Sequence, residues 1–203
     1  MLIGLGVIVG LSFALPAGAL MPQVVDAHAA SCSGWASTTR PPQTIRVLRH
    51  RTGRVVTVNF QRYVITVMGK EWPSYLPFQV LEAGAVAVKQ YGWYHALQGH
   101  QRISRRGECY DVVDSTRDQI YKPHKARVRP IHRRAVAATW ATTLVKRGKF
   151  LMTGYRRGDK RRCGRDATGY KLFARSATQC ARRGHSWLSI LKIYYGPRLE
   201  IRG

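Results

Sequence analysis

The sequence predicts a single α+β domain made of β-hairpins with interspersed helices. Apolar residues change several times along the chain between alternate spacing, typical of strands, and helical spacing, and glycine-containing turns separate the segments. The length of 203 residues is sufficient for one domain with a substantial core. Hydrophobic residues make up 45% of the chain, which argues against a disordered protein.

The elements follow in order from these patterns. Residues 44–60 alternate around a turn at Thr52-Gly53 and predict a hairpin, and Asn59 is placed to cap the next helix. Helical spacing predicts helices over residues 63–71, 77–97 and 132–144, and residues 110–121 are expected to be extended with a turn. A second hairpin is expected to turn at Arg147-Gly148. The C-terminal part predicts two short helices separated by Gly184, the second capped by Ser186.

The N-terminus predicts export. Residues 1–30 hold a long apolar run followed by Ala27 and Ala29 at signal-peptidase spacing, although no Lys or Arg precedes the run. A cleaved signal peptide, an uncleaved membrane anchor and, less well supported, lipidation at Cys32 stay open. Each places the protein outside the cell, secreted or at the cell surface. Residues 31–43 are expected to be an exposed lead-in, and residues 44–203 the folded domain.

The charge and the cysteines indicate partners and compartment. Lys and Arg number 34 against 10 Asp and Glu, a formal net charge of +24, which favours anionic polymers. Export excludes nucleic acid and leaves anionic wall polymers or lipid headgroups. An even number of cysteines in an exported chain predicts disulfides. Cys163 and Cys180 are close in sequence and are expected to pair, which leaves Cys32 for Cys109. No CxxC motif is present, so no structural metal is expected.

One carboxylate lies on an apolar helix face. Tyr63, Val64, Val67 and Met68 recur at helical spacing, and Glu71 continues their stripe immediately before Trp72-Pro73. Two interpretations are open. Glu71 is either a helix-end charge whose tip reaches water, or a general acid that apolar neighbours keep protonated.

From about residue 44 to 201 the chain resembles the stage II sporulation protein D family, also called the amidase-enhancer family. The resemblance rests on four collinear motifs: Tyr63-Val64, Val67 and Glu71-Trp72-Pro73; then Pro77, Leu81, Ala83, Ala85 to Ala87, Lys89 and Tyr91; then Arg134 to Thr139 with the hairpin from Leu144 to Lys149; and finally Ala181, Gly184, Trp187, Ile190-Leu191 and Tyr194-Tyr195.

The resemblance implies action on peptidoglycan, without a cofactor. Relatives are lytic transglycosylases, which cleave glycan strands with one acid–base group, or proteins that stimulate a cell-wall amidase. Glu71 matches the acid–base position, and Trp72, Lys89 and Tyr91 are candidates for substrate binding. Lys89 could also be a solvated helix charge. Asp111 and Asp114 are expected either to form ion pairs or to orient a substrate hydroxyl.

Departures from the family pattern affect the same region. Some relatives carry a Cys, His, Cys metal cluster, but the corresponding positions here are Val113, Arg117 and Asp118, so no metal is expected. Two loops beside the expected cleft also differ, at residues 155–158 and 173–176. A non-catalytic peptidoglycan-binding protein or amidase enhancer with the same fold is therefore the alternative to an enzyme.

Overall fold

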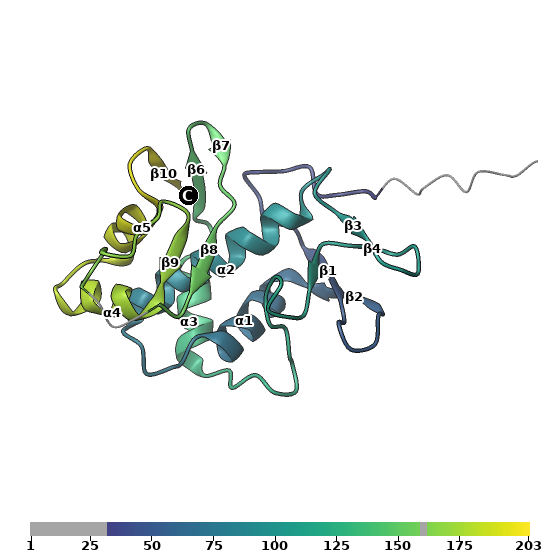
Figure 1. Ribbon diagram of the computed structural model, residues 1–203, viewed down its shortest axis with the longest axis horizontal. Coiled ribbons are helices and arrows are strands. Elements are labelled where there is room, and N and C mark those ends of the chain that lie inside the picture. The colour runs from purple at the N-terminus through teal and green to yellow at the C-terminus, as the bar shows by residue number, and fades with distance from the viewer. Residues whose placement is uncertain (1–31, 159–161) are drawn as a thin grey trace, which may run out of the picture.

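The computed structural model describes residues 32–158 and 162–203 (Figure 1). Its helices are α1 (Phe60–Glu71), α2 (Phe78–Ala96), α3 (Pro130–Ala138), α4 (Ala174–Arg182) and α5 (Trp187–Tyr195). Its strands are β1 (Thr44–Leu48), β2 (Val55–Asn59), β3 (Arg102–Ile103), β4 (Cys109–Tyr110), β5 (Val112–Val113), β6 (Thr143–Lys146), β7 (Lys149–Phe150), β8 (Gly154–Arg156), β9 (Lys171–Phe173) and β10 (Leu199–Arg202). The predicted α+β class is confirmed.

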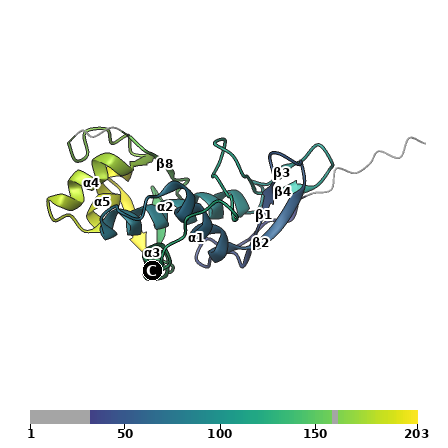
Figure 2. The same ribbon diagram turned by 90° about the horizontal axis from the view of Figure 1, so that it is seen from below.

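Helix α2 is the central element of the fold. It runs lengthwise through the molecule, with the β1–β2 hairpin at one end and α4 and α5 at the other (Figures 1 and 2). Most of its side chains are buried, because α1, α3 and α5 as well as several strands pack around it. Small residues allow this close packing: a Cβ on Gly92 would lie 3.0–3.3 Å from side-chain atoms of Phe60, Ile45 and Tyr63.

Small sheets cover this helix. Strands β2, β1 and β5 form one sheet, in which β1 and β2 are the predicted antiparallel hairpin and β5 runs parallel to β1. Strands β10, β6 and β7 form a second sheet, and β6–β7 is the predicted hairpin. The parallel pair β8–β9 and the added strand β10 were not predicted, because their partners lie 17 residues or more away in the sequence.

Several local predictions are confirmed. The Asn59 side chain accepts a hydrogen bond from the Arg62 amide at the start of α1, and Ser186 does the same for Ser189 at the start of α5. Both predicted disulfides, Cys32–Cys109 and Cys163–Cys180, are formed. Two disulfides are typical of a protein from an oxidising compartment.

The N-terminal predictions concern the leader, residues 1–30, and the lead-in, residues 31–43. The predicted leader, residues 1–30, lies outside the described residues. The lead-in lies against the C-terminal end of α2, where the Trp35 amide donates to Ala96 and the Trp93 indole donates to the carbonyl of Ser37 at 2.9 Å. In the part of the chain that the structure covers, no helix has the length and apolar character needed to cross a membrane.

Candidate active site

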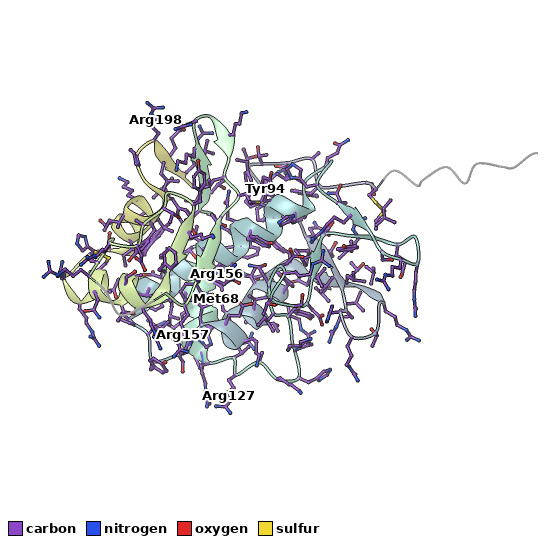
Figure 3. The ribbon with its side chains drawn as sticks, viewed as in Figure 1. Met68, Tyr94, Arg127, Arg156, Arg157 and Arg198 are labelled. Carbon is purple, nitrogen blue, oxygen red and sulfur yellow. A yellow bond between two sulfur atoms is a disulfide. The ribbon has the colours of Figure 1, made fainter. Side chains whose placement is uncertain are left out.

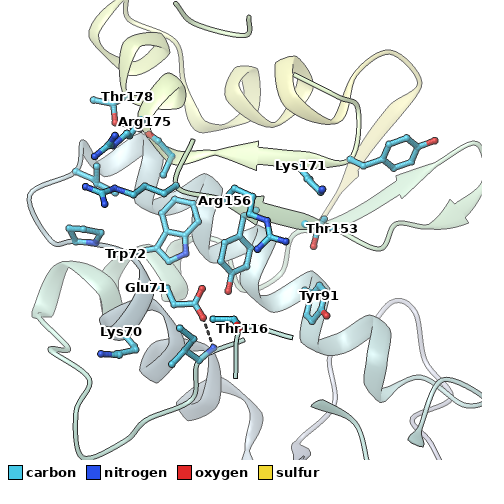
Figure 4. A pocket seen from close by; sticks show the side chains of 18 of the residues that line it. Lys70, Glu71, Trp72, Tyr91, Thr116, Thr153, Arg156, Lys171, Arg175 and Thr178 are labelled. Atoms are coloured by element: carbon cyan, nitrogen blue, oxygen red, sulfur yellow. Dashed lines mark hydrogen bonds between the residues drawn. The ribbon is translucent and has the colours of Figure 1, made fainter. Parts of the chain in front are cut away.

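A cavity of about 1080 Å³ opens beside the C-terminal end of α1 (Figure 4). Its walls come from the end of α1 and the segment that follows it, from residues 116–120, from β8 with the residues around it, and from one face of α4. Elements from both halves of the sequence therefore meet at the position where the sequence predicted a functional carboxylate.

Glu71 is the last residue of α1 and lies in this cavity, half-buried. The backbone N–H of Ile120 donates a hydrogen bond to its Oε1 atom (Figure 4), and the Tyr155 hydroxyl lies within hydrogen-bonding reach of the carboxyl. Burial raises the pKa of Glu71 above its ordinary value, although these two donors and the nearby Arg156 and Lys70 act in the opposite direction. The carboxyl is thus a candidate proton donor.

Trp72 forms the wall next to this carboxyl. Its indole packs on Gly84 of α2, where a Cβ would lie only 2.8 Å from ring carbons, and its ring centre lies 5.5 Å from that of Tyr155. The side chain is 2% exposed. Trp72 therefore forms an apolar wall beside Glu71, whose burial raises its pKa.

The rest of the cavity is strongly basic. Seven cationic side chains line it: Lys70, Arg117, Arg156, Arg157, Lys171, Arg175 and Arg182. Besides Glu71, Asp118 is the acidic residue among the lining residues, and its carboxylate forms an ion pair with Arg102 at 2.5 Å. Arg156, the last residue of β8, lies near the middle of the molecule, whereas Arg127 and Arg198 lie on opposite edges (Figure 3). The cavity is thus suited to an anionic ligand.

Of the predicted substrate-binding residues, Tyr91 and Trp72 line the cavity with Glu71. The Tyr91 hydroxyl donates to Asp118 at 2.8 Å. Asp111 and Asp114 do not line it. Asp111 pairs with Arg46 at 2.8 Å, and Asp114 pairs with Arg49 at 2.8 Å, so that both carboxylates hold the segment that follows β4 against β1. The ion-pair alternative therefore describes these two residues.

Lys89 is neither a solvated charge nor a residue of the cavity wall. Its side chain is 1% exposed, and Nζ donates to the carbonyls of Thr139, Trp140 and Thr142 at 2.9, 2.6 and 2.5 Å. Burial lowers the pKa of Lys89 to about 7, whereas the three carbonyl acceptors favour its charged form. In the fold this lysine joins α2 to the end of α3 and the segment leading into β6.

The residues at the metal positions of some relatives do not fit a metal. Val113 has no donor atom and the Arg117 side chain is cationic. The Asp118 carboxylate accepts from Arg102, from Tyr91 and from the Val113 amide. Although burial opposes it, the hydrogen bonds from Arg102, Val113 and Tyr91 lower the pKa of Asp118. Residues 32–158 and 162–203 contain no cluster of three or more His, Cys, Asp or Glu side chains placed to hold a metal.

The sequence did not predict that Gln119, Ile120 and Tyr155 would lie beside Glu71. Gln119 and Ile120 follow a polar turn, and Tyr155 lies in a short strand whose partner, β9, is separated from it by a charged loop. No periodicity in either segment points toward the α1 end. One local signal was present for Gln119: it is an uncharged polar residue directly before the apolar pair Ile120-Tyr121.

The middle of the sequence is similar to a known protein family. A family model described as Stage II sporulation protein (SpoIID) matches residues 49–145. The matched segment includes the end of α1 with Glu71, all of α2 and the loop with Gln119 and Ile120, whereas β8 and α4 follow it. The comparison with curated proteins found no match. Residues 49–145, just under half of the chain, are therefore similar to the Stage II sporulation protein (SpoIID) family.

Proposed function

We propose that this protein is a lytic transglycosylase that cleaves the glycan strands of peptidoglycan with Glu71 as its general acid and base. The observation that carries the proposal is a single half-buried carboxyl on the wall of a large basic cavity, with no carboxylate partner among residues 32–158 and 162–203. Asp118 also lines that cavity, but its negative charge is compensated by the ion pair with Arg102. One acid–base group is what this reaction needs, because no second carboxylate has to activate water.

The reaction would proceed in two proton transfers. Glu71 gives its proton to the glycosidic oxygen while the bond between that oxygen and C1 of the muramic acid breaks. The carboxylate then takes the proton of the C6 hydroxyl as O6 bonds to C1. The product end is a 1,6-anhydro sugar, and Glu71 has regained its proton. The Ile120 N–H stabilises the carboxylate between the two steps.

The test is a digest of peptide-stripped glycan strands, analysed by mass spectrometry, with wild type beside Glu71→Gln. Anhydro-ended fragments from the wild type alone are expected. Glu108→Gln is the matched control, since Glu108 is exposed and does not line the cavity, and it should cleave as the wild type does. Fragments from Glu71→Gln at the wild-type rate would contradict the role of this carboxyl.

The second candidate is a non-catalytic peptidoglycan-binding protein or an amidase enhancer. The observation that favours it is the cavity wall formed by β8 and α4, which departs from the family pattern and places Arg156, Arg157 and Arg175 there. In that case no digest would contain anhydro ends, while binding to the wall would persist. Addition of a cell-wall amidase would then show whether the protein raises the release of stem peptides.

A further inference from the structure

A chain of hydrogen bonds leads from the protein interior to Glu71. The hydroxyl of Tyr63, in α1, donates to Oε1 of Gln119 at 2.8 Å. Nε2 of Gln119 donates to the hydroxyl oxygen of Tyr155 at 3.2 Å, and that hydroxyl lies within reach of the Glu71 carboxyl. Tyr63 and Gln119 are fully buried. The proposed chemistry alone does not require this chain.

The direction of the chain is fixed by a backbone carbonyl. Nε2 of Gln119 also donates to the carbonyl oxygen of Val88 at 3.1 Å. A carbonyl can only accept, so the amide of Gln119 cannot be flipped without placing two acceptors against each other. Its second N–H is therefore directed at Tyr155. The oxygen of Tyr155 accepts this hydrogen, and its own O–H is left to donate to Glu71.

Both tyrosines keep their protons in this environment. Burial raises the pKa of Tyr63 and that of Tyr155 well above the ordinary value, and the nearby Glu71 adds to both shifts. Each is therefore a donor at neutral pH. Because every donor in the chain points the same way, the bonds polarise one another toward Glu71.

We propose that Gln119 is a positioning residue that makes Tyr155 an obligate hydrogen-bond donor to the Glu71 carboxyl. The backbone N–H of Ile120 is the other donor to this group. The Ile120 N–H cannot accept, and the Tyr155 oxygen already accepts from Gln119. The carboxyl therefore does not give its own proton to the protein, and that proton stays available to a ligand in the cavity. The catalytic consequence rests on the proposed function, whereas the direction of the hydrogen bond does not.

The test is the pKa of the Glu71 carboxyl, measured by ¹³C NMR titration. The chain has four glutamates, and the Glu71 signal is the one missing in Glu71→Gln. In Gln119→Leu, Tyr155 is free to turn its hydrogen away, and the pKa of Glu71 should rise by about one unit. Gln119→Met is the second variant if the leucine variant does not fold. Lys70 and Arg156, the cations that act on Glu71, are unchanged in both.

Gln90→Leu is the matched control. Gln90 is as buried as Gln119, and its Nε2 donates to the carbonyls of Leu144 and Leu151 at 2.8 and 3.1 Å, away from the cavity. Its loss removes a comparable set of hydrogen bonds, so that stability should fall in both variants. The pKa of Glu71 should move only when Gln119 is replaced.

A double-mutant cycle with Tyr155→Phe separates positioning from a general effect of the substitution. If Gln119 acts through Tyr155, Gln119→Leu should raise the pKa of Glu71 in wild type and leave it unchanged in the Tyr155→Phe background. An equal rise in both backgrounds, or no rise in wild type, would overturn the proposal. The titration needs no substrate. The absence of anhydro ends in the digest would therefore contradict the proposed function without deciding this inference.

Discussion

At the scale of single residues, the same glutamate carries both the proposed chemistry and a cost in stability. Glu71 lies half-buried between Trp72 and Ile120, and its raised pKa means that the folded chain binds its proton more tightly than the unfolded chain does. A neutral carboxyl is suited to this position. A charged one loses part of its hydration there, which destabilises the fold.

Glu71→Gln is therefore expected to stabilise the protein at high pH. The stability that Glu71 contributes is present below its ordinary pKa of 4.5 and is lost as pH rises through the higher folded value. The difference in free energy of unfolding between Glu71→Gln and wild type should grow with pH and level off above that value. Urea unfolding at a series of pH values measures it. A difference that does not change with pH would show that the pKa of Glu71 is not raised.

At the scale of elements, one aspartate, Asp118, holds in place the loop that follows β5. Asp118 accepts hydrogen bonds from Tyr91 of α2, from Arg102 of β3 and from the Val113 amide of β5. These contacts fix the short segment that presents Gln119 and Ile120 to Glu71. The carboxylate thus fastens this loop to α2, β3 and β5.

Asp118→Asn is expected to loosen this loop. The asparagine leaves the guanidinium of Arg102, 30% exposed, without its charged partner, and should lower the free energy of unfolding by about 2 kcal/mol. Hydrogen exchange should accelerate at the Ile120 amide, with Glu108→Gln as the control on an exposed carboxylate nearby. Unchanged protection of that amide would mean that the loop is held by its other contacts.

Elements that depend on neighbouring residues could be predicted from the sequence, and contacts between distant segments could not. The hairpin of residues 44–59 and the cap at Asn59 depend on neighbours in the chain and were predicted correctly. Lys89 shows the limit: the sequence suggested substrate binding or a solvated helix charge, whereas the side chain is buried and its three carbonyl acceptors belong to a distant turn. Tyr155 lies in β8, which pairs in parallel with β9, and no local pattern encodes that pairing.

At the scale of the whole molecule, a basic cavity lies in a chain of net charge +24. We expect binding to isolated cell-wall sacculi to weaken strongly as salt is raised from about 0.1 M to about 1 M, because the Debye length shrinks from about 10 Å to about 3 Å. Sedimentation of the protein with sacculi measures the bound fraction, and an uncharged polysaccharide is the control. Binding that is equal at both salt concentrations would show that contacts other than charge hold the protein on the wall.

The three aspartates that pair with arginines inside the fold affect how the protein would move along an anionic polymer. Asp111, Asp114 and Asp118 are bound to groups of the protein itself, so their charges do not interrupt the positive exterior. On a polymer of repeated negative groups, such a surface meets many equivalent binding positions, and it can exchange one for the next without dissociating. Its search for a cleavable or bound position would then take place along the polymer rather than through the surrounding solution.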